Sequence, residues 1–258
     1  MFRRTLNKFL KPAGLELSRP RSRTLEFPVE LGESDQSVVR HIIENRLSMT
    51  SPERLFATLL ACRHVEERGI TGDFVECGVW RGGNSLIAAQ VFGSQGANGR
   101  MVRLFDTFAG MTAPTDDDFT NADSVAARIK FEQSQRETHN EWCYASLDDV
   151  RNNFSVAGLL ADNVRFVKGD VCQTLSDPAN LPDRIAVLRL DTDWYESTKV
   201  ELEVLWPLLQ PGGILMVDDY GHWGGAKKAV DEFFASRQRP FFSYIDATGR
   251  IAVKEVPG

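Results

Sequence analysis

Five short apolar runs separated by helical patterns constrain the fold of this chain more than any other feature. The runs are rich in aliphatic and β-branched side chains and occupy residues 73–78, 101–106, 164–170, 185–191 and 213–219. Such near-continuous hydrophobicity is typical of strands that are buried on both faces. Helical patterns lie between the runs, over residues 82–92, 146–158, 196–209 and 225–236. This alternation predicts an α/β fold with a doubly wound parallel sheet.

Residues at both ends of this alternation complete the predicted architecture. Residues 240–245 and 250–256 are joined by "DATG" and predict a closing antiparallel hairpin, which gives a seven-stranded, mostly parallel sheet. Helical spacing over 35–48 and 51–69 predicts two helices before the sheet. We expect one structural domain, in which an arm and helices over residues 1–70 pack on a core formed by residues 71–258.

The polar segment 109–145 interrupts the alternation. It contains "PTDDDFTNADS" and "EQSQRETHNEW" and has no clean strand pattern. A loop this long in a compact domain is usually disordered or functional. Because it follows the carboxyl end of the second predicted strand, we predict a lid with a short helix near residues 124–135.

The charge distribution argues against a nucleic acid partner. The net charge of the 258 residues is −6, while residues 1–23 carry seven Arg or Lys and one Glu, so the remainder carries about −12 by subtraction. An acidic body of this kind lacks the broad basic surface that nucleic acid binding requires. A small-molecule substrate is therefore favoured.

The cysteines and the hydropathy pattern indicate a cytoplasmic protein without a membrane span. The four cysteines form no Cys-x-x-Cys pair, and no run of 18 apolar residues is present. The basic amphipathic arm, "MFRRTLNKFLK", resembles transit peptides and membrane-surface helices. We prefer a helix that packs on the body or on a neighbouring subunit, and we expect a homo-oligomer.

Glycines and acids follow the predicted strands, at the edge where open parallel sheets bind ligands. Glu76, Gly78 and Gly82 form a Glu-x-Gly-x-x-x-Gly turn into a helix. This spacing differs from the dinucleotide-binding Gly-x-Gly-x-x-Gly, and a tight structural turn is an equally good interpretation. Asp106 ends the second strand, where an acid can bind two ribose hydroxyls. The alternative for Asp106 is a cap for the following segment.

Two pairs of carboxylates follow the fourth and fifth strands. Asp191 and Asp193 lie in "LDTDW", and Asp218 and Asp219 lie in "VDDYG". Adjacent strands lie about 5 Å apart, so the pairs can converge, and carboxylates that close repel one another unless a cation is present. Oxygen ligands favour a hard ion such as Mg²⁺. The alternative is that Asp193 and Asp219 cap the next helices.

Together these stretches resemble the macrocin O-methyltransferase family. The resemblance rests on "VECGVWRGGNSL", "FDTFAGM", "LRLDTDWYEST" and "LLQPGGILMVDDYGHWGGAKKAVDEFF". It implies a class I methyltransferase fold, S-adenosylmethionine and Mg²⁺ as cofactors, and methylation of sugar hydroxyls in antibiotic biosynthesis.

The resemblance also implies site residues. The metal ligands would be Asp191, Asp218 and Asp219, and Asp193 would be the general base, with Asp191 in the catalytic site beside it. The cofactor would contact Met49, Thr50, Glu76, Gly78, Trp80, Gly82, Ser85, Asp106, Thr107, Phe108, Asp170, Val171 and Asp191. His139, Trp142 and Tyr220 are predicted to contact the glycoside substrate. His139 and His222 compete with Asp193 for the role of base.

Two other functions stay open at this point. A catechol or other phenolic acceptor would use the same chemistry but would chelate the metal through two oxygens and need less help from a base. A non-catalytic nucleoside-binding protein would keep the fold without the reaction. The complete set of mutually repelling acids argues against this last possibility.

Overall fold

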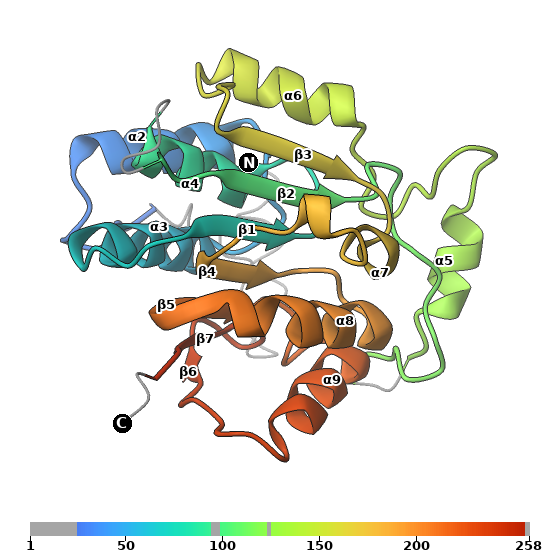
Figure 1. Cartoon of the computed structure of the whole chain (residues 1–258). Helices are drawn as coiled ribbons and strands as arrows, with labels where there is room; N and C mark the ends of the chain where they lie inside the picture. Colours follow the sequence, from blue (N-terminus) through green and yellow to red (C-terminus); the bar gives the residue numbers. More distant parts are fainter. Residues whose placement is uncertain (1–24, 94–98, 123–124, 256–258) are drawn as a thin grey trace, which may run out of the picture.

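The computed structural model describes residues 25–93, 99–122 and 125–255, which form a seven-stranded sheet in the order β3-β2-β1-β4-β5-β7-β6 (Figure 1). Strands β1 to β5 are parallel, and β7 is antiparallel to both β5 and β6. The strands are β1 (Asp73–Cys77), β2 (Val102–Asp106), β3 (Val164–Lys168), β4 (Ile185–Leu190), β5 (Leu209–Val217), β6 (Ser243–Tyr244) and β7 (Arg250–Val253). The predicted class I methyltransferase architecture is confirmed.

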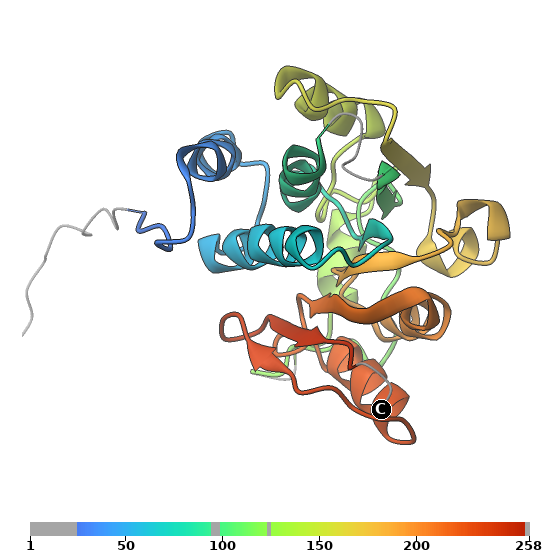
Figure 2. The same cartoon turned by 60° about the vertical axis from the view of Figure 1, so that its left-hand side comes forward.

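Helices cover both faces of the sheet (Figure 2), which explains why the central strands are mostly apolar. All six residues of β4 are buried. One core lies between the sheet and α2 (Glu33–Glu44), α3 (Pro52–Glu67), α4 (Gly83–Phe92) and α6 (Leu147–Val156). The other lies beneath α7 (Val171–Thr174), α8 (Tyr195–Leu205) and α9 (Gly224–Phe234). Short 3-10 helices also occur: η3 (Pro178–Asn180) lies between α7 and β4, and η4 (Trp206–Leu208) lies between α8 and β5.

Local sequence signals place the helix boundaries well. The side chain of Ser51 accepts a hydrogen bond from the backbone N–H of Arg54, and Pro52 occupies the first position of α3. In α9 the apolar positions predicted to face the core are all buried, namely Ala226, Ala229, Val230, Phe233 and Phe234. Helix α7 was not predicted, because its four residues are too short for a periodic pattern.

The closing hairpin is shorter than predicted. Strand β6 contains only Ser243 and Tyr244, and both are exposed at the edge of the sheet. Phe241, inside the apolar run predicted as a strand, is 84% exposed. Pro240 lacks a backbone N–H, so the start of this run cannot pair along its full length.

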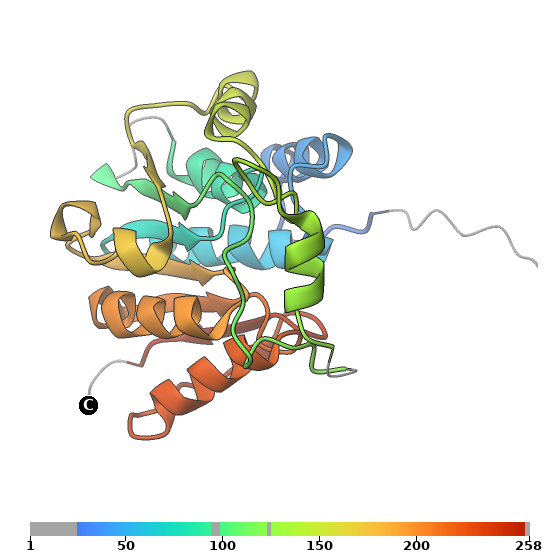
Figure 3. The same ribbon diagram turned by 90° about the vertical axis from the view of Figure 1, so that its right-hand side faces the viewer.

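The segment predicted as a lid lies at the carboxyl ends of the parallel strands (Figure 3). It carries α5 (Arg128–Ser134), which agrees with the short helix predicted there. Its action as a lid stays a prediction. The basic amphipathic arm lies outside the described residues. No helix in the described part of the chain combines the length and apolar character needed to cross a bilayer.

Candidate active site

A cleft with a volume of about 290 Å³ opens at the carboxyl ends of the parallel strands. Most of the residues predicted from the sequence line it. These are Met49, Thr50, Glu76, Gly78, Trp80, Asp106, Thr107, Trp142, Asp170, Val171, Asp191, Asp193, Asp218, Asp219 and His222. The fold therefore gathers residues from five different strand ends and from the lid segment into one site.

The glycine turn after β1 is held by Asp106. One carboxylate oxygen of Asp106 accepts hydrogen bonds from the backbone N–H groups of Val79 (2.7 Å) and Trp80 (3.1 Å). The other accepts from the N–H of Phe108 at 2.7 Å. Burial raises the pKa of Asp106 while these backbone donors lower it. Asp106 thus fixes the shape of the turn and still faces the cleft.

Only glycine fits at position 78. Its φ of 83° lies in the left-handed region, and an added Cβ would lie 2.0 Å from the carbonyl oxygen of Asp191. The end of β1 therefore packs directly against the chain that follows β4. This contact brings the glycine turn and the acidic loop to the same part of the cleft.

Glu76 is a buried acid beside the glycine turn. Its carboxylate accepts hydrogen bonds from the Ser85 hydroxyl and, at 2.7 Å, from Arg189. Burial raises the pKa of Glu76 to about 7, although Arg189 and Ser85 oppose this shift. A carboxylate, a glycine turn that lets a ligand approach the backbone closely and the acid after β2 fit the charged and polar groups of a nucleoside sulfonium cofactor.

Other predicted residues lie outside the cleft lining. Ser85 acts indirectly through Glu76, and Gly82 begins α4 with a φ of 90°. The ring of Phe108 packs against Phe166. Ser85, Gly82 and Phe108 therefore lie next to the residues of the turn but do not line the cleft.

Two of the three predicted substrate residues also lie elsewhere. His139 stacks on Tyr144 with ring centroids 4.2 Å apart, and both residues line a separate pocket. The hydroxyl of Tyr220 donates a hydrogen bond to Asp231 at 2.8 Å, and its ring stacks on Phe242. Only Trp142 of this predicted set lines the cleft.

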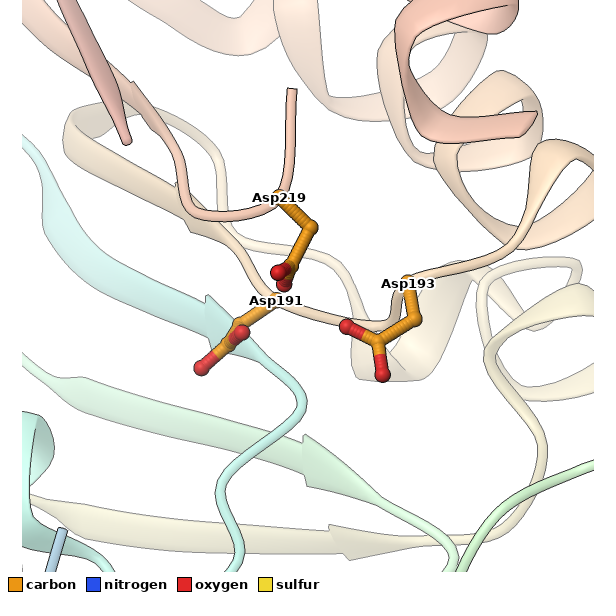
Figure 4. Close-up of side chains that lie close together, drawn as sticks. All are labelled: Asp191, Asp193 and Asp219. Atoms are coloured by element: carbon orange, nitrogen blue, oxygen red, sulfur yellow. The ribbon is translucent and has the colours of Figure 1, made fainter. Parts of the chain in front are cut away.

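Three carboxylates meet on the tips of β4 and β5. Asp191, Asp193 and Asp219 each offer an oxygen within 4.8 Å of the others. Figure 4 shows these three side chains close together. Burial and mutual repulsion raise the pKa of Asp191 to about 7 and the pKa values of Asp193 and Asp219 well above their ordinary range. Oxygen-only ligands at this spacing fit a hard divalent cation, which would relieve the repulsion.

The capping interpretation of these acids is wrong. Helix α8 has Trp194 at its N-cap and α9 has Trp223, and neither helix has a side-chain hydrogen bond from its N-cap residue. Asp193 also has a φ of 71°, which is strained for a residue with a side chain. Strain of this kind concentrates at functional sites.

Asp218, the other predicted metal ligand, is engaged differently. Its carboxylate pairs with the guanidinium groups of Arg189 and Arg54, and its side chain is 7% exposed. Burial and Asp191 raise the pKa of Asp218, which lies at about 7 because both arginines oppose the shift. The cluster that the fold assembles is therefore Asp191, Asp193 and Asp219, with Asp218 next to it.

Several cleft residues were missed from the sequence. Arg54, Asn84 and Lys130 line the cleft, as does Cys143. Arg54 sits in the first turn of α3, which the Ser51 cap predicts, but its ion pair reaches a residue 164 positions away. No local pattern signals a contact of that range.

An aromatic cluster closes one side of the cleft. The rings of Trp142, Trp194 and Trp223 lie 5.0 to 5.8 Å apart between centroids. Trp194 and Trp223 directly precede α8 and α9, while Trp142 comes from the lid segment. The ammonium of Lys130 lies 4.0 Å from the centre of the Trp142 ring. The cluster joins the lid segment to both acidic loops.

Comparisons with known proteins agree with the fold. The sequence profile of the macrocin O-methyltransferase (TylF) family matches residues 27–251. The chain is 42% identical over 152 residues to a tetracenomycin-class rhamnosyl 4'-O-methyltransferase of Streptomyces olivaceus. It is 33% identical over 191 residues to demethyldecarbamoylnovobiocin O-methyltransferase of Streptomyces niveus. The matches cover 59% and 74% of this chain and 54% and 69% of those relatives, so the chain spans little more than half the length of the first.

Solved structures give the same relationship. The O-methyltransferase NovP superimposes with a TM-score of 0.69 at 31% identity, over 81% of this chain and 82% of NovP. The calicheamicin methyltransferase CalS11 matches with a TM-score of 0.58 at 17% identity, over 93% of this chain and 98% of that chain, and supports the fold alone. The family match covers most of the chain and agrees with the quoted motifs. The chain belongs to the macrocin O-methyltransferase family.

Proposed function

We propose that this protein is an Mg²⁺-dependent O-methyltransferase that moves a methyl group from S-adenosylmethionine to a sugar hydroxyl of a glycosylated natural product. The observation that carries the proposal is the cluster of Asp191, Asp193 and Asp219 on adjacent strand tips beside the cleft. The activities for which the relatives are named support it, since one methylates a rhamnosyl group and another is a mycinamicin III 3''-O-methyltransferase.

The cofactor is expected in the half of the cleft next to the glycine turn. Glu76, Gly78 and Asp106 line that half, and Asp170 caps α7 close by. Met49 and Thr50 come from the segment before α3 and line the same cleft. Together they would hold the methyl group toward the acidic cluster.

Methyl transfer from a sulfonium requires the acceptor oxygen, the methyl carbon and the sulfur to be collinear, so positioning supplies much of the rate. When bound, S-adenosylmethionine supplies the electrophilic methyl group, and a divalent cation supplies positive charge that lowers the pKa of a sugar hydroxyl. Asp191 and Asp219 would hold the cation. Asp193 would accept the hydroxyl proton, because its carboxylate lies beside Asp191 and Asp219 and lines the same cleft.

Replacing Asp193 by Asn tests this assignment. We expect kcat on a sugar acceptor to fall by about 10² to 10⁴-fold, because general-base catalysis contributes about that much. The Kd for S-adenosylmethionine, measured by calorimetry, should stay within about twofold of the wild-type value. Unchanged turnover of the Asp193→Asn variant would contradict the role of base and would favour a catechol-type acceptor.

The substrate class is tested by transfer of a labelled methyl group to a panel of deoxysugar glycosides and catechols, with and without a metal chelator. The proposal predicts label in a glycoside, lost with chelator and restored by added Mg²⁺. Cofactor binding without turnover on any acceptor would support a non-catalytic protein. Undiminished methylation after complete removal of metal would contradict the proposed mechanism.

A further inference from the structure

Asp118 is a fully buried carboxylate in the lid segment, and its partners are neutral. One oxygen accepts a hydrogen bond from the backbone N–H of Tyr195 at 2.8 Å. The other accepts from the N–H of Thr115 at 2.7 Å and from its hydroxyl at 2.9 Å. In the described part of the chain no Lys, Arg or His forms an ion pair with Asp118. A buried charge without a cation is costly, so its position demands an explanation.

The position of Asp118 is the junction between two helix starts. Tyr195 is the first residue of α8, whose own N-cap residue gives no side-chain hydrogen bond, so Asp118 caps this helix from a distant segment. Gly225 lies in the first turn of α9, and a Cβ there would lie 1.9 Å from the Asp118 carboxylate. The positive ends of both helices therefore stabilise the charge.

Each of these helices continues directly from an acidic loop. Asp193 lies two residues before the start of α8, and Asp219 lies five residues before the start of α9. Neither Asp193 nor Asp219 is the N-cap residue of the helix that follows it. The distance between the two acids therefore depends on how the two helix starts are fixed relative to each other.

The lid segment is also bonded to both loops through its backbone. The carbonyl of Phe119 accepts from the N–H of Gly224 at 2.8 Å, and the N–H of Asn121 donates to the carbonyl of His222 at 2.7 Å. The indole N–H of Trp194 donates to the carbonyl of Thr112 at 3.0 Å. Figure 3 shows the lid segment running past the starts of α8 and α9.

We propose that Asp118 is a positioning residue, which holds Asp193 and Asp219 at the separation that cation binding and proton transfer require. The inference rests on the proposed function of the acidic cluster. Mg²⁺ demands near-ideal octahedral geometry with ligands at about 2.0–2.1 Å, so a small shift of one loop weakens binding. A displacement of about 1 Å in a catalytic group costs up to about 10²-fold in rate.

The test replaces Asp118 by Asn, which keeps the shape of the side chain. An amide turns one acceptor oxygen into a donor, so either the Tyr195 or the Thr115 N–H faces another donor. We expect Mg²⁺ affinity, measured by calorimetry, to fall by about 10-fold or more and kcat by about 10 to 100-fold. The Kd for S-adenosylhomocysteine should change less than about twofold, and added Mg²⁺ should recover part of the activity.

Asp117 provides the matched control. It is the adjacent residue, half-exposed, and it pairs with Lys228 of α9 at 2.9 Å. Asp117→Asn removes a lid-to-helix ion pair without touching the helix starts and should leave Mg²⁺ affinity and kcat unchanged. Equal Mg²⁺ affinity and kcat in folded Asp118→Asn and wild-type protein would overturn the inference.

A second variant covers the case in which Asp118→Asn does not fold. Thr115→Val removes the hydroxyl that donates to Asp118 and preserves size. It should weaken Mg²⁺ binding in the same direction by a smaller factor, and wild-type affinity in this variant would also contradict the role of Asp118. Failure of the wild-type protein to bind Mg²⁺ or to methylate any acceptor would instead refute the proposed function.

Discussion

At the scale of single residues, Arg189 balances part of the negative charge of the acids at the strand tips. Its side chain is 1% exposed and pairs with Glu76, Asp191 and Asp218. Although burial opposes its charge, these carboxylates raise the pKa of Arg189, so it stays protonated. Arg54 also pairs with Asp218, but these two cations face five acids, which are Glu76, Asp191, Asp193, Asp218 and Asp219, so a negative excess remains at the strand tips. This excess accounts for the raised pKa values of the acids and favours a bound cation.

Glu201 is a buried acid whose ionisation makes the stability of the folded protein depend on pH. It lies on α8, is 0% exposed, and accepts a hydrogen bond from the Thr192 hydroxyl at 2.8 Å. Its other oxygen has no hydrogen-bond partner among the described residues. Burial raises the pKa of Glu201 from 4.5 to about 8. The native state therefore holds this proton more tightly than the unfolded chain, and stability falls as pH rises between about 4.5 and 8.

Glu201→Gln should remove this pH dependence, because the amide cannot ionise. We expect the variant to gain on the order of 1–3 kcal/mol of unfolding free energy relative to wild type between pH 5 and pH 8.5. Urea denaturation across this range measures it. Glu203→Gln, on the exposed side of the same helix, is the control and should follow the wild-type curve. Parallel curves for Glu201→Gln and wild type would show that Glu201 is already ionised in the folded protein.

Local patterns predicted the site residues whose positions follow directly from strand ends. Glu76, Asp106, Asp191 and Asp219 all lie at or just after a buried strand, and parallel strands bring these ends together. Asp118 could not be predicted in this way. Its partner Tyr195 lies 77 positions away, and only the folded lid segment brings them into contact.

At the element scale, the lid segment is attached to the core through aromatic packing. Trp142 is 9% exposed and meets Trp194 and Trp223 edge-on or tilted. Since Trp194 and Trp223 precede α8 and α9, the lid segment and the acidic loops share one packing unit. The short lid helix was predicted from the sequence, but this attachment was not, because single aromatics carry no partner information.

Trp142→Leu should loosen the lid segment while leaving the sheet intact. We expect trypsin cleavage at Arg128, Lys130 or Arg136 to accelerate by about 5-fold or more, because local opening becomes easier. The KM for the acceptor should rise, with little change in cofactor affinity. Trp206→Leu is the control, since Trp206 packs against Phe234 away from the cleft. Equal cleavage rates in the two variants would mean that Trp142 does not hold the lid segment.

At the scale of the whole molecule, the fold followed from a few robust signals. Apolar runs alternating with helical spacing were sufficient for the seven-stranded sheet, because strands buried on both faces must be apolar. The edge of the sheet was less predictable, and β6 is shorter than its apolar run suggests. There, exposure at the edge and Pro240 decide the extent of pairing, and neither is a matter of hydrophobicity.

The same sheet topology determines where the acidic loops after β4 and β5 lie. Strands β4 and β5 are adjacent and parallel, so two acidic loops that are distant in sequence converge next to the cofactor cleft. A protein without chemistry would have no use for several buried, repelling carboxylates at this position. The proposed function therefore depends on a divalent ion binding at the tips of β4 and β5.

The most direct test is a crystal structure of the protein with S-adenosylhomocysteine and Mn²⁺, with the ion located by anomalous scattering. We predict one Mn²⁺ site per chain at the tips of β4 and β5, with carboxylate oxygens of Asp191 and Asp219 bound directly to the ion. An Asp191→Asn, Asp219→Asn double variant crystallised in the same way should lack this site. No anomalous peak at saturating Mn²⁺, or a peak bound by other residues, would contradict the account.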